Sequence, residues 1–341
     1  MHIRSACLLF SLSITTLFCS FSSKSQSASP DSVTLMFAGD VTLADFFERE
    51  VGDSLSYPFA RMKWFGDADL TMVNLENPMT LRGTRVEKEY NFRANPKYAR
   101  LLHGSGIDLV TLANNHILDY GSEGVFDTIA NLDSAEVRHV GAGLNLDAAR
   151  KPVIVDINGL RIGFLGYLDS IRTRTLQFAG DSTAGPAGFT MDSLLQDIAR
   201  LRDQADYIVI NYHWGVEKSH ETQQRQIDIA HRAIDAGADL IVGHHPHVLQ
   251  GIERYKGKVI AYSLGNFIFG GNSHHSYATA VLRISIPVRS PSAYRARIIP
   301  VYVERWQPYA LKGSGARRIL RQVEDYSEIF PDNIFSVDTT K

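Results

Sequence analysis

Cysteine is nearly absent from this chain. Only two cysteines occur among 341 residues, Cys7 and Cys19, and both precede residue 28. A chain cleaved near that point would contain no cysteine, which excludes a disulfide framework and thiolate metal sites. Its stability would therefore depend on its core, and a bound metal would depend on carboxylate, carboxamide or imidazole ligands.

An excess of basic charge is also missing. The chain has 35 Lys and Arg against 37 Asp and Glu, a net charge of −2, so we predict no nucleic-acid partner. With 44% hydrophobic and 21% charged residues, the composition is that of a globular protein with a sizeable core. The length indicates one large domain or two smaller ones.

The N-terminal segment is typical of an export signal. Arg4 precedes the apolar, Ser/Thr-rich residues 5–21, and a Ser-rich stretch with small residues at Ser25 and Ser27 follows. The run is slightly short for a membrane span. Residues 1–27 are therefore predicted to be a signal peptide of a protein exported to the periplasm or cell surface. Lipid attachment at Cys19 is an alternative, although a bulky Phe18 precedes it, and an uncleaved N-terminal membrane anchor is another.

Short apolar runs alternate with amphipathic segments along the rest of the chain. Strands are expected at residues 33–37, 70–73, 108–112, 207–210, 240–242 and 259–262, a hairpin around Asn158-Gly159, and antiparallel strands at 278–288 and 295–304. Helices are expected at 58–65, 95–102, 122–134 (capped by Ser122), 189–204, 221–236 and 316–329, and a mobile loop at 170–187. This pattern predicts a layered α/β fold, with central mixed sheets flanked by helices. We place the main domain at residues 28–311 and a C-terminal helix and tail at 312–341.

Polar side chains follow most of these strands, at the edge of the sheet where ligands bind in open α/β folds. They are Asp40, Glu76, Asn115, His116, His213, His245, His247 and Asn266. Singly, Asp40 and Asn115 could be turn residues and His213 a packed core histidine. Together, two carboxylates, carboxamides and four imidazoles form a ligand set for a divalent ion, and Mn, Zn or Fe is favoured in the absence of thiolates.

The order of these motifs resembles that of a known family. The motifs are Gly39-Asp40, Asn74-Leu75-Glu76, Ala113-Asn114-Asn115-His116 with Asp119-Tyr120-Gly121, His213-Trp214-Gly215-Val216-Glu217, Gly243-His244-His245-Pro246-His247 and Ser263-Leu264-Gly265-Asn266-Phe267. Over about residues 33–304 the chain resembles the CapA (PGA_cap) family of poly-γ-glutamate capsule-synthesis proteins. That family is similar in fold to calcineurin-like metallophosphoesterases.

The resemblance implies a role for each matching residue. Asp40 matches the first-motif carboxylate and is also a candidate catalytic residue, and Glu76 matches the carboxylate that bridges two metals. His116 matches the general acid. The remaining implied metal ligands are Asn115, His213, His245 and His247. The candidate substrate contacts beside them are Asn74, Asn114, His244 and Asn266.

One ligand of the phosphoesterase pattern is missing, because Thr42 stands where a histidine is usual. One implied metal site keeps Glu76, Asn115, His213 and His245, whereas the other keeps only Asp40, Glu76 and His247. We therefore expect one firm metal site and a second that is weak or empty.

Two functions fit these observations. The first is a metal-dependent hydrolase or transferase of phosphoester or amide-like bonds in the cell envelope, acting on an anionic polymer or a phosphoester. The second is a non-catalytic, polymer-binding or accessory subunit of a membrane capsule-synthesis complex. The missing histidine at position 42 favours the second, and the presence of His116 favours the first.

Overall fold

The computed structural model describes residues 31–169 and 177–335. The predicted signal peptide, Cys19, and residues 170–176 of the predicted mobile loop lie outside the described residues. The described residues belong to one compact unit, and the C-terminal helix packs within it.

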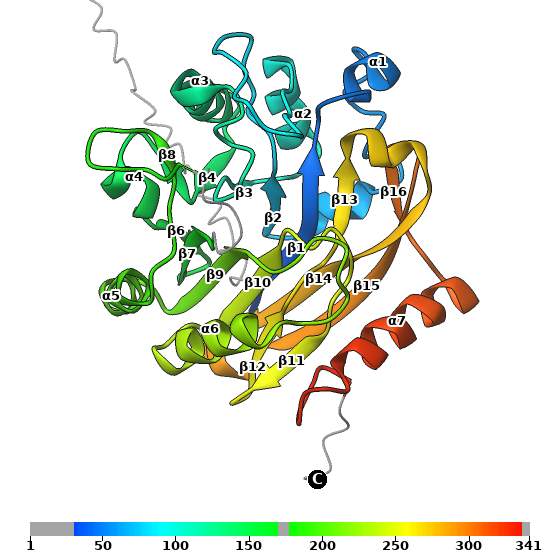
Figure 1. Ribbon diagram of the computed structural model, residues 1–341. Coiled ribbons are helices and arrows are strands. Elements are labelled where there is room, and N and C mark those ends of the chain that lie inside the picture. The colour runs from blue at the N-terminus through cyan, green and yellow to red at the C-terminus, as the bar shows by residue number, and fades with distance from the viewer. Residues whose placement is uncertain (1–30, 170–176, 336–341) are drawn as a thin grey trace, which may run out of the picture. The chain divides into compact units, whose positions relative to one another are not determined.

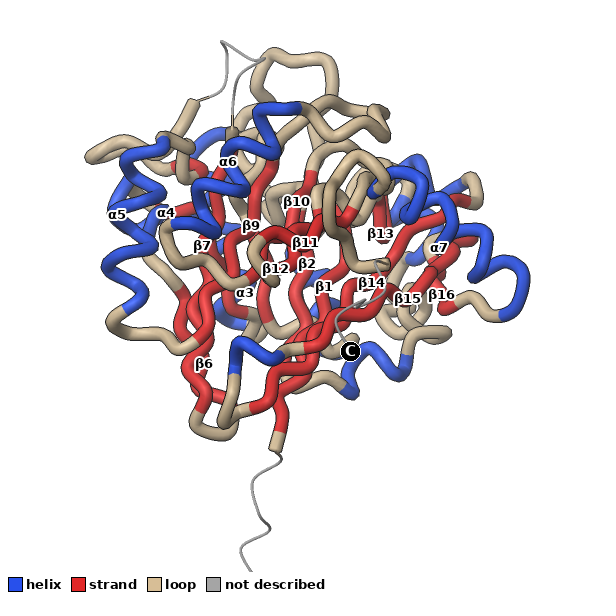
Figure 2. Tube along the Cα trace, turned by 90° about the horizontal axis from the view of Figure 1, so that it is seen from below, coloured by secondary structure: helices blue, strands red, loops and turns tan. Residues whose placement is uncertain are grey.

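Two mixed β-sheets form the centre of this unit (Figures 1 and 2). The first has the order β16-β15-β14-β1-β2-β3-β4, with β13 also paired to β1. Its strands are β1 (Ser32–Thr42), β2 (Leu70–Leu75), β3 (Leu109–Thr111), β4 (Arg138–Val140), β13 (Asn266–Phe269), β14 (Tyr277–Pro287), β15 (Arg295–Glu304) and β16 (Gln307–Ala310).

The second sheet has the order β11-β12-β10-β9-β7-β6. Its strands are β6 (Val153–Ile157), β7 (Leu160–Leu168), β9 (Tyr207–His213), β10 (Leu240–His244), β11 (Ile252–Tyr255) and β12 (Lys258–Ala261). A small sheet pairs β5 (Ala142–Gly143) with β8 (Gly185–Pro186).

The two large sheets pack face to face. Alternate residues of β1, including Leu35 and Phe37, share one buried cluster with Val209 of β9 and Val242 of β10. The other face of the first sheet is covered by α1 (Phe47–Val51), α2 (Ala99–Gly104) and α3 (Gly121–Ser134), and the other face of the second by α4 (Leu146–Arg150), α5 (Met191–Arg202) and α6 (Gln224–Asp235). Because the central strands are buried on both faces, they read as continuous apolar runs in the sequence. The predicted layered α/β fold is confirmed.

The last helix, α7 (Gly313–Ser327), closes the edge of the core between the sheets. Its Ile319 and Val323 are buried in the cluster that joins the sheets, and it lies beside β15 and β11 (Figure 1). No helix within the described ranges has the length and apolar character needed to cross a membrane.

Several local predictions were wrong. Residues 58–65 form turns followed by a 3₁₀ helix at Lys63–Asp67, and Ser122 lies inside α3, whose N-cap Tyr120 makes no side-chain cap. Short strands β11, β13 and β16 were not predicted. The expected hairpin and the antiparallel β14–β15 pair are present. Asp40 lies inside β1 instead of after it, because β1 continues past Gly39 to pair with β13.

Candidate metal centre

The site is built where strands of both sheets end beside one another. Glu76 directly follows β2, the segment 114–116 follows β3, and His213 is the last residue of β9. In the second sheet His244 ends β10, and His245 and His247 stand in the loop after it. Packing the two sheets face to face thus brings ligand-type residues from remote parts of the chain to one place.

A bulge in β1 aims Asp40 into this place. The register of β1 shifts on either side of Asp40, which pairs with Asn74 in β2 and with Asn266 in β13. Gly39 permits this approach, since a Cβ there would lie 1.7 Å from the carbonyl oxygen of Gly265. The amide of Asp40 donates to that same oxygen at 2.9 Å. Bulges commonly redirect side chains at active sites.

The histidine loop has an unusual backbone. His245 and His247 have φ values of +95° and +59°, a region that non-glycine residues rarely occupy. The amide of His245 lies 3.3 Å from Oδ2 of Asp40, and the amide of Lys218 donates to the carbonyl of Pro246 at 2.8 Å. Strained conformations persist where the surrounding structure enforces them, most often at functional sites.

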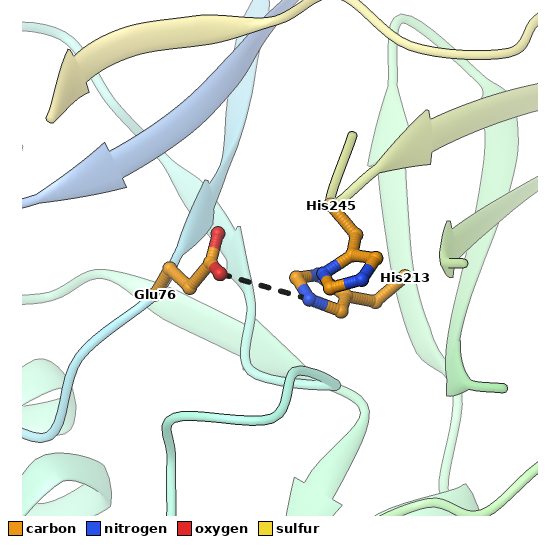
Figure 3. Close-up of side chains that lie close together, drawn as sticks. All are labelled: Glu76, His213 and His245. Carbon is orange, nitrogen blue, oxygen red and sulfur yellow. Dashed lines mark ion pairs between the residues drawn. The ribbon is translucent and has the colours of Figure 1, made fainter. Parts of the chain in front are cut away.

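Two groups of ligand atoms share Glu76. The ligand atoms of Glu76, His213 and His245, which Figure 3 draws, lie within 4.8 Å of one another. Those of Asp40, Glu76 and His247 do so as well. These groups match the division of the histidines that the sequence implied, with His245 in one and His247 in the other. A third group joins the exposed Glu217 to His245 and His247. Sequence reasoning missed Glu217 as a ligand candidate, although it lies four residues after His213.

The Oε1 atom of Glu76 is the centre of this arrangement. It is buried and has no hydrogen-bond partner within the described part of the chain. It lies 3.7 Å from Nε2 of both His213 and His247 and 4.0 Å from Nε2 of His116. These distances are too long for hydrogen bonds but suit oxygen and nitrogen ligands around a divalent ion. The residues present therefore fit a divalent metal. Oδ1 of Asn115 lies 2.8 Å from Nε2 of His213, a hydrogen-bond distance that places this carboxamide beside the ligand set.

Asn74 and Asn114 hold the carboxylates in position. The side-chain Nδ2 of Asn74 donates to Oδ1 of Asp40 at 2.9 Å and to Oε2 of Glu76 at 3.0 Å. Asn114 donates in turn to Oδ1 of Asn74 and to the carbonyl of Leu75, and accepts from the amide of His116. Both asparagines are 0% exposed, which contradicts the substrate contacts expected for them.

His244 and Asn266 also contact site residues. His244 is 2% exposed and its Nδ1 lies 3.3 Å from Oδ1 of Asp40, so burial contradicts its expected substrate contact as well. Oδ1 of Asn266 lies 2.9 Å from Nδ1 of His247, and Asn266 borders an open pocket. Thr42 is buried, and its hydroxyl has no hydrogen-bond partner among residues 31–169 and 177–335.

His116 is oriented by a carboxylate and a lysine. Its Nδ1 lies 2.8 Å from Oδ2 of Asp119, which leaves Nε2 facing Glu76. Lys88 pairs with Oδ1 of Asp119 and donates to the carbonyl of Asn115 at 2.9 Å. The ring of Phe92 covers His116, with 4.2 Å between centroids. The sequence alone did not associate Lys88 with the site, because it lies in a loop that reads as solvent-exposed.

The pKa values of the two carboxylates of the site are shifted in opposite directions. Burial would raise the pKa of Asp40, but its pairing with His244 and His247 holds that pKa well below its usual value. Burial raises the pKa of Glu76 well above its usual value. Burial would lower the pKa of His247, but Glu76 and Asp40 raise it to about 9. Burial lowers the pKa of His116, and lowers that of His213 well below its usual value, so His213 is held in the neutral form that a metal ligand requires.

Comparison with known proteins identifies relatives along most of the chain. The family model described as bacterial capsule synthesis protein PGA_cap matches residues 34–271. The capsule biosynthesis protein CapA of Bacillus anthracis is 29% identical over 304 residues, covering 86% of this chain and 73% of that protein. The PGA biosynthesis protein CapA of Bacillus subtilis is 29% identical over 309 residues, covering 88% and 80%.

One solved structure matches over most of this chain. It is a hypothetical protein from Thermus thermophilus, with a TM-score of 0.49 and 21% identity, covering 79% of this chain and 99% of that one.

Proposed function

This chain belongs to the bacterial capsule synthesis protein PGA_cap family, and on that premise we propose that it is an exported, metal-dependent hydrolase or transferase. Its substrate would be a phosphoester or amide-like bond in an anionic capsule polymer or its precursor. Relatives named for capsule and PGA biosynthesis support this class of substrate and a role beside a membrane capsule-synthesis complex.

The unpartnered Oε1 of Glu76 is the observation that carries the proposal. This oxygen has no hydrogen-bond partner among the described residues. Burying an unpartnered carboxylate oxygen costs free energy, and an ion shared with the surrounding imidazoles would offset that cost. Glu76, Asn115, His213 and His245 would hold a first divalent ion, Mn, Zn or Fe. Asp40, Glu76 and His247 would hold a second, weaker one. When bound, such an ion supplies Lewis-acid polarisation of a phosphoryl or carbonyl oxygen.

The protein's own residues supply proton transfer and orientation. Nε2 of His116 faces the same space as Oε1 of Glu76, while its Nδ1 is held by Asp119. Nε2 is therefore the atom positioned to give a proton to a leaving group or take one from it. Asn74 fixes Asp40 and Glu76 relative to one another, so the ligand set is arranged before substrate binds.

A non-catalytic, polymer-binding or accessory role is the second candidate. It is favoured by Thr42, whose buried hydroxyl stands where the phosphoesterase pattern has an imidazole. With one ligand fewer, the Asp40 group would bind its ion weakly, and a mechanism needing two metals would be impaired.

The two candidates separate in one experiment on the full chain. Bound metals are measured, and phosphodiesters, phosphomonoesters and γ-glutamyl peptides are assayed with and without Mn. If the protein is an enzyme, we expect turnover to fall about 10²- to 10⁴-fold in His116→Ala while bound metal is retained. Bound metal without turnover on any class supports the accessory role, and absence of metal refutes the site. Export is tested by fractionating the producing cells and detecting the protein in the envelope fraction.

A further inference from the structure

A third carboxylate, that of Glu217, lies on the exposed side of the metal centre. One of its oxygens and one ring nitrogen from each of His245 and His247 lie within 4.8 Å of one another. His245 belongs to the ligand group of the first ion, and His247 belongs to that of the second. Glu217 therefore lies beside one imidazole of each group, as Glu76 does from the buried side.

The loop that carries Glu217 is joined to the histidine loop by backbone hydrogen bonds on both sides of this residue. The amide of Trp214 donates to the carbonyl of His244 at 3.1 Å. The amide of Lys218 donates to the carbonyl of Pro246 at 2.8 Å. Because the two loops are bonded in this way, the backbone at Glu217 is held at a defined distance from the imidazoles.

A buried glutamine fixes the same loop beyond Glu217. Nε2 of Gln250 donates to the carbonyl of Ser219 at 3.0 Å and to that of Glu221 at 3.1 Å. Lys218 has a φ of +60°, which a residue with a side chain rarely adopts. Such backbone persists where the surrounding structure enforces it, most often at functional sites. The turn that presents Glu217 is thus a fixed part of the centre, although its side chain is exposed.

Glu217 has no basic partner in the part of the chain that the structure describes. No ion pair there joins its carboxylate to a lysine or arginine, whereas Asp119 beside the site pairs with Lys88. Its charge is therefore available to a cation at the centre. Two divalent ions carry more positive charge than Asp40 and Glu76 balance, because a neutral imidazole ligand carries none. A third carboxylate reduces this excess.

The second ion is the one that lacks a ligand. Thr42 ends β1 in the first sheet, whereas Glu217 follows β9 in the second sheet, so the two residues reach the centre from different sheets. Carboxylate oxygen suits Mn, Zn and Fe as imidazole nitrogen does. Ligand atoms about 2.0–2.2 Å from one ion lie up to about 4.4 Å apart, so a small rotation of the exposed side chain brings Glu217 into a coordinating arrangement.

We infer that Glu217 is a metal ligand of this centre, which binds from the exposed side and supplies the ligand that Thr42 does not. This inference rests on the proposed function, since it adds a residue to the same metal centre. The second ion depends on Glu217 most, because its group otherwise offers only Asp40, Glu76 and His247.

Binding of Mn²⁺ to the full chain, measured by equilibrium dialysis, tests the inference. Glu217→Gln keeps the size of the side chain but removes its charge, and we expect the affinity for the more weakly bound ion to fall at least about tenfold. The tightly bound ion is expected to remain. Glu221→Gln makes the same change at an exposed position of the same loop, outside the three ligand groups, and is expected to bind both ions like the wild type.

A second measurement distinguishes a ligand from a charge that acts at a distance. At about 1 M salt the Debye length is roughly 3 Å, so a field effect is screened, whereas the loss of a ligand persists. The visible spectrum of Co²⁺ bound in place of Mn²⁺ reports the atoms around the ion. We expect this spectrum to change in Glu217→Gln and to stay the same in Glu221→Gln.

Three outcomes would overturn the inference. They are equal binding of both ions by the wild type and Glu217→Gln, a loss in Glu217→Gln that disappears at about 1 M salt, and binding of only a single ion by the wild type at saturating Mn²⁺. Turnover of a small chromogenic phosphodiester with Mn is measured in parallel. Its absence in a wild type that binds both ions through Glu217 refutes the proposed enzyme and leaves the ligand assignment standing. A wild type that binds no metal refutes both.

Discussion

Oε1 of Glu76 lies 3.7 Å from Nε2 of His213, with both side chains buried and no hydrogen bond to that oxygen within the described residues. Glu76→Gln keeps the shape of the side chain but removes the shared anionic ligand. We expect bound metal to fall by more than about tenfold, because even residues that only support ligands typically cost about 10- to 100-fold in affinity. Metal content after dialysis measures this, with Glu324→Gln, an exposed carboxylate of α7 outside the three ligand groups, as control.

The same substitution is expected to stabilise the metal-free protein. A buried carboxylate with a raised pKa beside Asp40 costs free energy that a neutral amide avoids, so the free energy of unfolding should rise by about 1 kcal/mol. Urea unfolding with chelator present measures this. A less stable metal-free Glu76→Gln protein would contradict the cost assigned to the buried carboxylate, and unchanged metal content would contradict a shared metal at Glu76.

His245 and His247 are expected to differ in their effect on metal binding. His247→Gly leaves the group formed by Glu76, His213 and His245 intact, so the tightly bound ion should be retained. His245→Gly removes a ligand of that group and should lose it. Glycine is the suitable replacement because both residues have positive φ, which alanine tolerates poorly. Metal stoichiometry in the two variants checks the prediction, and loss in His247→Gly alone would reverse the assignment.

Gly39→Ala is expected to disrupt the bulge that carries Asp40. The new Cβ would lie 1.7 Å from the carbonyl oxygen of Gly265, a backbone atom that cannot move without breaking the β1–β13 pairing. We expect a loss of at least about 3 kcal/mol in the free energy of unfolding, or insoluble protein. Gly104→Ala, where nothing lies within 4 Å, is the control and should change stability by less than about 0.5 kcal/mol. An unchanged unfolding midpoint in Gly39→Ala would contradict the close approach.

His139 is expected to make stability depend on pH. Burial lowers its pKa in the folded state, and its Nδ1 has no hydrogen-bond partner in the described part of the chain. Above about pH 6.5 the imidazole is neutral in both states and has no effect. Below that pH the unfolded state takes up the proton first, so stability falls as pH decreases, by at most about 1.4 kcal/mol per pH unit.

The comparison of wild type with His139→Asn isolates this effect from that of the other histidines. The difference in free energy of unfolding between the two proteins should be constant above about pH 6.5 and should shift in favour of the variant below it. A difference that does not vary with pH would show that His139 titrates alike in the folded and unfolded states.

The layered α/β fold was predictable because strands that are buried on both faces appear in the sequence as continuous apolar runs. Amphipathic helices, in contrast, show apolar residues at helical spacing. Boundaries were less predictable where tertiary pairing extends an element. The strand before Asp40 runs on to Thr42 because β13 pairs with it, and β13 itself is a short segment whose partner is remote in sequence. The helix at Gly313–Ser327 was predicted, but its attachment to the start of β11 through Ser327 and Tyr326 was not.

By itself the sequence determined the ligand types and their order along the chain, since carboxylates, carboxamides and imidazoles after strands are local features. It also determined the position of the missing histidine, Thr42. Only the tertiary structure decided that Asn74, Asn114 and His244 are buried beside the carboxylates, and that Lys88 pairs with Asp119 next to His116. The reason is physical: burial and proximity depend on how two sheets and a terminal helix pack, and such contacts leave no periodic signal in the sequence.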